Sequence, residues 1–134
     1  MDVRKDETFE LAVSEDVVRV RQQARLWAVQ IGFSLVDQTK IVTAASELGR
    51  NTVEHGKGGS ARLRWIVNGA RQGLRLDFVD DGPGIVDMEL ALRDGYTTGN
   101  GLGLGLSGSR RLMNEFEIES APGKGTRVTV VRWT

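Results

Sequence analysis

The sequence predicts an α/β (α+β) fold, a two-layer sandwich in which helices cover a mixed, largely antiparallel sheet. Two long segments place apolar residues at three- to four-residue spacing, which is typical of amphipathic helices packed on a sheet. Later segments alternate apolar and polar residues in two hairpin patterns, one in the middle of the chain and one at its end. Because 134 residues suffice for one ordinary core, we expect a single domain over residues 1–134.

One strand and two helices are expected in the first half of the chain. Residues 9–13 alternate in polarity, which indicates a short half-buried strand. Ser14 is expected to cap the first helix and Gly32 to end it, whereas the second helix begins at Ser34 or Asp37. The residues expected to face the sheet are Val20, Ala24, Trp27, Ala28 and Ile31 in the first helix and Ile41, Ala44, Ala45, Leu48 and Thr52 in the second.

The second half is expected to hold four strands and two shorter helical segments. Alternation at 61–67 and 74–78 around a turn at 68–73 predicts an antiparallel hairpin with one face covered. The stretch Asp80-Asp81-Gly82-Pro83-Gly84 then breaks the second strand. The elements expected after this break are a helical segment at 87–93, a helix at 107–115, a strand beginning at Phe116, a turn at 121–125 and a last strand ending at Trp133.

Composition excludes several classes of function. The chain has 18 Lys and Arg against 18 Asp and Glu, so its bulk charge gives no support for a nucleic-acid or membrane-surface partner. The absence of Cys excludes disulfides, thiol catalysis and a Cys-ligated metal, and a single His excludes any mechanism that needs two. No apolar run approaches the roughly 20 residues of a membrane span, and residues 1–6 lack the apolar region of a signal peptide. We therefore expect a cytoplasmic protein.

A glycine-rich segment, Gly99–Gly108, requires a functional reason because alternating glycine is unfavourable in helices and strands. Its backbone N–H groups can hold a phosphate, and the helix expected after it adds partial positive charge. A flexible linker is a poorer interpretation, since the alternating Leu residues require burial. Residues 103–108 also match the dinucleotide pattern G-x-G-x-x-G, but the strand that this pattern needs is not expected at 94–98. A Walker loop is excluded because the sequence before Gly123-Lys124 lacks its first glycine.

Glu47 and Asn51 lie four residues apart on the second expected helix, so both side chains project from one face. A carboxylate beside an amide oxygen can deprotonate a nucleophile and bind a hard cation. The alternative is an ordinary solvated helix edge. His55 continues the same face, and we interpret it as a helix-end residue.

Asp80 shares the alternation phase of Leu76 and Phe78, so its side chain should point under the helices, whereas Asp81 should point to the opposite side. A carboxylate at the end of an apolar strand face needs a hydrogen-bond donor, and an adenine amino group is one. The alternative is an Asp that caps its own turn before a glycine.

These motifs, in their order along the chain, resemble the N, G1, G2 and G3 boxes of the GHKL ATPase/kinase superfamily. The resemblance implies the Bergerat fold, with ATP bound between helices and sheet under a lid, and it covers nearly the whole chain. It implies that Glu47 is the catalytic base and that Asn51 binds Mg²⁺. The motifs are Glu47-x-x-x-Asn51, Asp80-x-Gly82-x-Gly84, Gly99-x-Gly101-Leu102-Gly103-Leu104 and Gly123-x-Gly125-Thr126. The ATP-binding residues implied are Asp80, Gly82, Gly84, Gly99, Gly101, Leu102, Gly103, Leu104, Gly105 and Thr126.

Within that superfamily the short chain is similar to the anti-sigma-type serine/threonine kinases, and most of all to the RsbT-type switch kinases of the bacterial stress response. The resemblance rests on Ser46-Glu47-Leu48-x-Arg50-Asn51 and on the segment from Gly105 to Phe116. It implies a partner-switching kinase that phosphorylates a STAS-domain antagonist and then binds a downstream phosphatase, with no nucleic-acid or membrane partner. The alternative is an ATP-gated binding module, an anti-sigma-like regulator with little catalysis. A Rossmann-like dinucleotide binder is a third interpretation.

Overall fold

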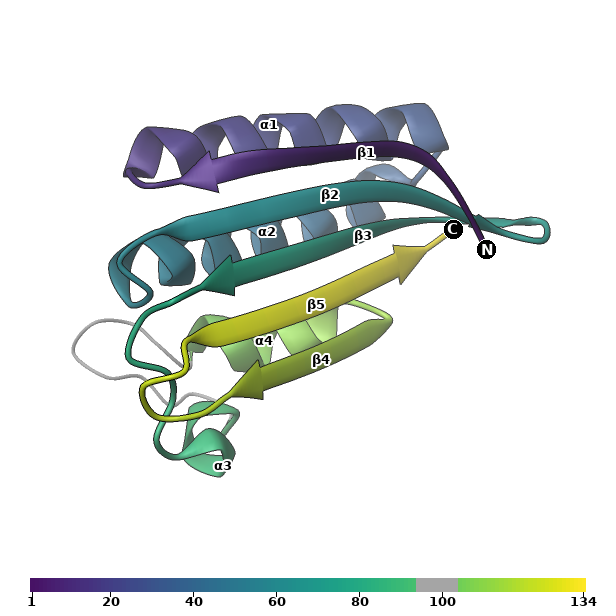
Figure 1. Cartoon of the computed structure of the whole chain (residues 1–134). Coiled ribbons are helices and arrows are strands. Elements are labelled where there is room, and N and C mark those ends of the chain that lie inside the picture. The colour runs from purple at the N-terminus through teal and green to yellow at the C-terminus, as the bar shows by residue number, and fades with distance from the viewer. Residues whose placement is uncertain (94–103) are drawn as a thin grey trace.

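The structure is a computed structural model, and it describes residues 1–93 and 104–134 of the chain. Within these ranges the helices cover one face of a five-stranded sheet, as Figure 1 shows. The elements in chain order are β1 (Asp2–Leu11), α1 (Ser14–Ile31), α2 (Leu35–Glu54), β2 (Gly59–Asn68), β3 (Arg71–Asp80), α3 (Met88–Ala91), α4 (Leu104–Leu112), β4 (Glu115–Ser120) and β5 (Thr126–Trp133).

The sheet has the strand order β1-β2-β3-β5-β4, and all four pairings between its strands are antiparallel. The predicted two-layer sandwich is confirmed, and its sheet is antiparallel throughout the described residues. The register pairs Asp80 at the end of β3 with Thr126 at the start of β5. The two residues predicted to bind a nucleotide from these strands are therefore direct neighbours.

The predicted helix α1 is confirmed, but the prediction that Ser14 caps it is wrong. The cap position is Val13, and the helix start is closed by Asp16, whose Oδ2 accepts hydrogen bonds from the backbone N–H groups of Ala12 (2.8 Å) and Val13 (3.1 Å). A carboxylate on the third residue of the helix thus binds the backbone just before the helix, where a hydroxyl cap was expected. At the other end Gly32 takes the left-handed conformation, with φ of 105°, as predicted.

Helix α2 begins after Ser34, whose side chain accepts a hydrogen bond from the backbone N–H of Asp37 at 3.2 Å. This decides between the two predicted starting points. The stripe of α2 residues predicted to face the sheet is buried, including Leu48 and Thr52. A long amphipathic helix therefore crosses the sheet and ends close to the end of β3.

Strand β1 is longer than predicted, because it begins at Asp2 and ends before Val13. Its first residues are polar, so alternation of apolar side chains does not reveal them. Lys5 replaces an apolar residue on the covered face, where its Nζ lies 5.7 Å from the ring centroid of Trp27 and 5.5 Å from that of Trp65. The aliphatic stem and charge of a lysine thus fill a position where the sequence pattern shows no hydrophobe.

Two further boundaries differ from the prediction. The hairpin turn is shorter than 68–73, since Asn68 pairs with Arg71 and Gly69 has φ of +63°. Helix α4 ends at Leu112 rather than near residue 115, because the backbone N–H of Asn114 already donates to the carbonyl of Val131 in the sheet.

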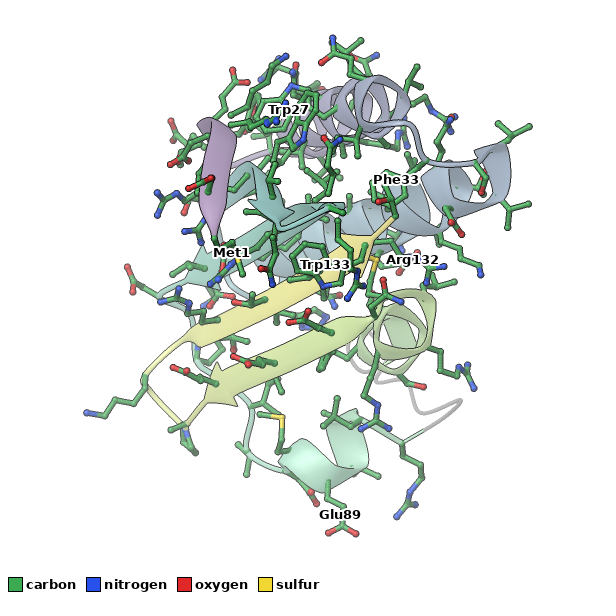
Figure 2. The ribbon with its side chains drawn as sticks, turned by 90° about the vertical axis from the view of Figure 1, so that its right-hand side faces the viewer. Met1, Trp27, Phe33, Glu89, Arg132 and Trp133 are labelled. Atoms are coloured by element: carbon green, nitrogen blue, oxygen red, sulfur yellow. The ribbon has the colours of Figure 1, made fainter. Side chains whose placement is uncertain are left out.

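Arg132 joins β5 to the first turn of α2 and to the last turn of α4. Its Nη2 lies 2.9 Å from Oδ1 of Asp37 in α2, and its Nη1 donates to the carbonyl of Leu112 at the end of α4 (3.1 Å). Figure 2 labels Arg132 at the end of β5. The ends of α2 and α4 are thereby fixed relative to the sheet. None of the helices in residues 1–93 and 104–134 has the length and apolar content to cross a membrane.

Candidate active site

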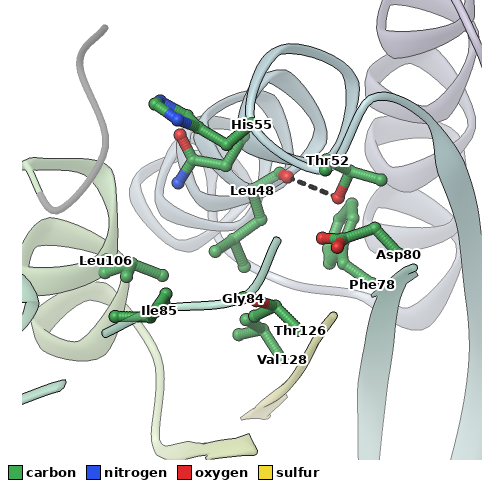
Figure 3. Close-up of a pocket in the computed structure, with 12 residues that line it drawn as sticks. Leu48, Thr52, His55, Phe78, Asp80, Gly84, Ile85, Leu106, Thr126 and Val128 are labelled. Atoms are coloured by element: carbon green, nitrogen blue, oxygen red, sulfur yellow. Dashed lines mark hydrogen bonds between the residues drawn. The ribbon is translucent and has the colours of Figure 1, made fainter. Parts of the chain in front are cut away.

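A pocket lies where the end of α2, the end of β3, the start of β5 and the start of α4 meet (Figure 3). Its apolar wall is formed by Leu48, Phe78, Ile85, Leu106 and Val128. Its polar groups come from Asn51, Thr52, His55, Asp80 and Thr126. An apolar wall with a few convergent polar groups is the usual composition of a small-molecule site.

Asp80 points into this pocket, as the alternation along β3 predicts, whereas Asp81 is exposed. The Oδ1 atom of Asp80 accepts a hydrogen bond from the backbone N–H of Gly82 at 2.9 Å. Burial raises the pKa of the Asp80 carboxyl, against the opposing effect of hydrogen bonds from the backbones of Gly82 and Thr126. The turn-capping interpretation and the ligand-binding interpretation of this residue are therefore compatible, since the side chain caps its turn and still faces the pocket.

Glycines surround Asp80 because the backbone approaches it closely. A Cβ atom on Gly56 would lie 2.3 Å from Cγ of Asp80, and one on Gly82 would lie 2.7 Å from Cα of Gly56. Gly84, which lines the pocket, has φ of +77°, a conformation that other residues rarely adopt. The predicted residues Gly82 and Gly84 are thus brought together with Asp80, and Gly56 joins them.

Thr126 is held beside Asp80 by Ser120. The Oγ atom of Ser120 donates to the carbonyl of Gly125 (2.9 Å), lies 2.9 Å from Oγ1 of Thr126, and accepts the backbone N–H of Ile85 (2.8 Å). This one hydroxyl connects the loop after β3 to the turn between β4 and β5. It therefore fixes the wall of the pocket that carries Asp80 and Thr126.

Asn51 lies on the pocket face of α2, and its side-chain Nδ2 is buried without a hydrogen-bond partner. Buried polar groups in native proteins are nearly always paired, so an unpaired one in a pocket points to a missing partner. Thr52, in contrast, is satisfied by the carbonyl of Leu48 at 3.0 Å, the dashed line in Figure 3. The Nδ2 atom of Asn51 is therefore an unpaired buried donor on this face.

Glu47 lies one helical turn before Asn51, about 6 Å further along the α2 axis from the end that meets Asp80. It does not line the pocket itself. Its side chain is 31% exposed, and its carboxylate is paired with Arg50, with Nη2 to Oε1 at 3.0 Å and Nη1 to Oε2 at 3.2 Å. The order along the site is therefore Asp80, then Asn51, then Glu47.

The predicted phosphate loop falls largely outside the described residues, namely at Gly99, Gly101, Leu102 and Gly103. The structure begins again at Leu104, where α4 starts, so Leu104 and Gly105 belong to the first turn of that helix. Leu106, in the same turn, lines the pocket. The positive end of the helix dipole is thus beside the pocket, where a phosphate is stabilised.

The residues present fit a nucleotide with a divalent cation. The apolar wall suits a purine, Asp80 is an acceptor for its amino group, and the unpaired amide of Asn51 can turn to present either its nitrogen or its oxygen. In residues 1–93 and 104–134 there is no cluster of three His, Cys, Asp or Glu side chains that could hold a metal. A cation at Asn51 would therefore take most of its oxygen ligands from water and phosphate, as Mg²⁺ commonly does.

Asp77 supports the site from the opposite face of β3. It is only 3% exposed although no helix of the described chain covers that face, because arginine side chains lie over it. Arg64 (2.6 Å) and the hydroxyl of Thr129 (2.6 Å) donate to its carboxylate, and Arg75 does so at 3.1 Å. Although burial alone would raise it, these hydrogen bonds lower the pKa of Asp77 to about 2.

Sequence reasoning missed three residues that the structure places at the site. His55 and Gly56 line the pocket, and Ser120 fixes one wall. The sequence pattern places His55 on this helix face, although we interpret it there as a helix-end residue, and the same spacing carried past Thr52 could have added Gly56. The role of Ser120 leaves no sequence pattern, because it depends on the approach of two loops distant in the chain.

Comparison with known proteins gives consistent matches. Residues 36–133 match the family model described as histidine kinase-, DNA gyrase B-, and HSP90-like ATPase. The chain is 40% identical over 118 residues to serine/threonine-protein kinase RsbT of Bacillus subtilis, which covers 88% of this chain and 89% of that protein. It is 30% identical over 129 residues to an anti-sigma F factor of Thermoanaerobacter, which covers 92% of this chain and 89% of that protein.

Solved structures share the fold. The crystal structure of the RsbU and RsbW domains of a Mycobacterium tuberculosis protein superposes with a TM-score of 0.67 at 24% identity, covering 96% of this chain and 32% of the other. The mycobacterial sensor histidine kinase MprB superposes with a TM-score of 0.57 at 21% identity, covering 96% of this chain and 97% of the other.

Proposed function

The chain belongs to the family of histidine kinase-, DNA gyrase B- and HSP90-like ATPases and is a serine/threonine-protein kinase of that family, and on this premise we propose that it phosphorylates a STAS-domain antagonist in a bacterial partner-switching stress pathway. The observation that carries the proposal is one pocket with half-buried Asp80 at one end and the unpaired Nδ2 of Asn51 at the other, with Glu47 one turn beyond. Residues 1–134 act as one ATP-binding kinase domain.

ATP lies with its adenine at Asp80 in this proposal. The carboxylate accepts a hydrogen bond from the adenine amino group, and the neighbouring Thr126 supports that end. Gly82 and Gly84 allow the backbone to lie close to the base, because neither residue carries a Cβ atom. The backbone is already crowded there, since a Cβ on Gly82 would lie 2.7 Å from Cα of Gly56. Residues 99–105 hold the phosphates, a role that stays a prediction from the sequence.

Asn51 is the residue that would hold Mg²⁺, through its amide oxygen. When bound, the cation neutralises negative charge that develops on the transferred phosphate. The chain itself contributes the position of that oxygen, which α2 fixes between the adenine end and Glu47.

Glu47 is the general base of the transfer. Its partly exposed carboxylate stands beyond the pocket, so a hydroxyl of another protein can reach it from solvent. The acceptor oxygen loses its proton to Glu47 and attacks the γ-phosphorus, while the bond to the bridging oxygen breaks and ADP leaves with that electron pair. A STAS-domain antagonist is the protein partner that the resemblance to RsbT-type kinases favours, and a downstream phosphatase is a second partner. The proposal requires a compartment that supplies ATP, and the cytoplasm does so.

An ATP-gated binding module is the second candidate, and one observation favours it. Glu47 does not line the pocket. A chain in which Glu47 stayed out of reach of the acceptor hydroxyl with bound ATP would bind its partner without transferring phosphate.

Transfer of radiolabel from ATP to purified STAS-domain proteins of the same organism tests the proposal. We expect label on one of them with the wild type and a loss of about 10²-fold or more with Glu47→Gln, because the amide keeps the shape and removes the base. Titration of ATP controls for binding, which Glu47→Gln should leave intact. Equal labelling by the two proteins rules out Glu47 as the base, and no labelling by either supports the binding module.

A further inference from the structure

We propose that Arg50 is the positioning residue of the catalytic base, an inference that rests on the proposed function and adds a residue to it. Arg50 holds the carboxylate of Glu47 in one orientation through two parallel hydrogen bonds. The guanidinium acts through Glu47 and makes no contact with the nucleotide in this scheme.

The guanidinium of Arg50 makes a bidentate contact with the carboxylate of Glu47. Nη2 of Arg50 meets Oε1 of Glu47 at 3.0 Å, and Nη1 meets Oε2 at 3.2 Å, so both oxygens are fixed. The two residues are three apart on α2, where side chains one turn apart face each other. A planar guanidinium makes this bidentate contact, and a lysine ammonium does not.

The pair leaves Glu47 able to accept a proton. An ionised carboxylate has roughly four lone-pair directions, and the two hydrogen bonds from Arg50 use one on each oxygen. The side chain of Glu47 is 31% exposed, so the remaining directions are open to a hydroxyl of a docked protein. Arg50 therefore orients the base without occupying the positions that catalysis needs.

Orientation, rather than stability, is what this contact provides. Arg50 is 52% exposed, and an exposed ion pair three residues apart on a helix adds little to folding stability. A free Glu side chain, however, samples several rotamers, and misplacing a reacting group by about 1 Å lowers a rate by about 10²-fold. A variant of Arg50 should therefore fold normally and transfer phosphate slowly.

In the transfer step Glu47 takes the proton of the acceptor hydroxyl and becomes neutral beside the Arg50 cation. The acceptor oxygen forms its bond to the γ-phosphorus, and the bond from that phosphorus to the bridging oxygen breaks. ADP leaves with the electron pair of that bond, and the proton on Glu47 returns to water afterwards. Arg50 gains and loses no proton in this sequence.

A double-mutant cycle of Glu47 and Arg50 tests the proposal. The acceptor is the STAS-domain protein that receives radiolabel from the wild type, and every variant is made in the full chain. We expect Arg50→Gln to lower kcat for transfer by about tenfold or more while leaving KM for ATP and the melting temperature unchanged. The kcat of Arg50→Lys should lie between those of Arg50→Gln and the wild type, because one ammonium can contact only one oxygen at a time. Arg25→Gln, on the exposed side of α1, is the matched control and should behave as the wild type.

Measuring Arg50→Gln in the Glu47→Gln protein distinguishes a role of Arg50 in positioning Glu47 from a purely structural role of Arg50. There Arg50→Gln should cause no further loss, since the group that Arg50 positions is gone. An unchanged kcat in Arg50→Gln, or the same proportional loss with and without Glu47, overturns the inference and leaves the proposed function standing. Equal transfer by Glu47→Gln and the wild type overturns both.

Discussion

Replacing Gly56 by alanine is the sharpest test of how the pocket holds Asp80. The added Cβ would lie 2.3 Å from Cγ and 2.5 Å from Oδ2 of Asp80. Carbon atoms in contact sit about 3.5–4.0 Å apart, so the carboxylate must move by more than about 1 Å. The shift takes it out of hydrogen-bond range of an adenine amino group placed against it.

The expected loss follows from that hydrogen bond. A hydrogen bond to a charged group contributes about 1.5–3 kcal/mol, so Gly56→Ala should weaken ATP binding by roughly tenfold to about 150-fold. Isothermal titration calorimetry measures it, and thermal unfolding shows whether the variant remains folded. Gly108→Ala in α4 is the matched control, because nothing lies within 4 Å of its added Cβ. A folded Gly56→Ala protein with the ATP affinity of the wild type would show that the position of the Asp80 carboxylate does not matter for ATP binding.

Two further predictions concern the metal and the support of β3. Asn51→Ala should remove the Mg²⁺ dependence of ATP binding, and a titration of Mg²⁺ that gives the same curve for variant and wild type would show that Asn51 is only a helix residue. For Asp77, the pKa of about 2 in the folded chain lies below the ordinary 3.8, so folding favours the ionised form. At about 1.4 kcal/mol per unit of pKa difference, the ionised Asp77 contributes about 2 kcal/mol to the free energy of unfolding. This contribution is complete above about pH 4 and is lost as the pH falls toward about 2. In urea unfolding, the free energy of unfolding of the wild type should exceed that of Asp77→Asn by an amount that shrinks below about pH 4. A difference independent of pH would contradict the lowered pKa of Asp77.

Helices, hairpins and the direction of Asp80 could be predicted because each depends on periodicity along one segment. The stripe from Ile41 to Thr52 is buried as its spacing predicts, and Asp80 follows the phase of Phe78 into the pocket. These features need no knowledge of what lies across the molecule.

The remaining features depend on contacts between distant segments. The polar start of β1 becomes a strand because it pairs with β2, and Lys5 is accommodated by two tryptophan rings from other elements. Gly56 matters only because β3 brings Asp80 against it. Ser14 loses its predicted role to Asp16, a competition between two good capping residues that propensity alone does not decide.

Calorimetric titration of Mg·ATP into Asp80→Asn and Asp81→Asn shows whether this pocket binds ATP through Asp80. The two carboxylates are adjacent in sequence, but Asp80 lines the pocket and Asp81 is exposed. Asp80→Asn should weaken ATP binding by roughly tenfold or more, because the half-buried charged acceptor is lost, while Asp81→Asn should bind as the wild type does. Equal affinities for Asp80→Asn and the wild type would contradict the account.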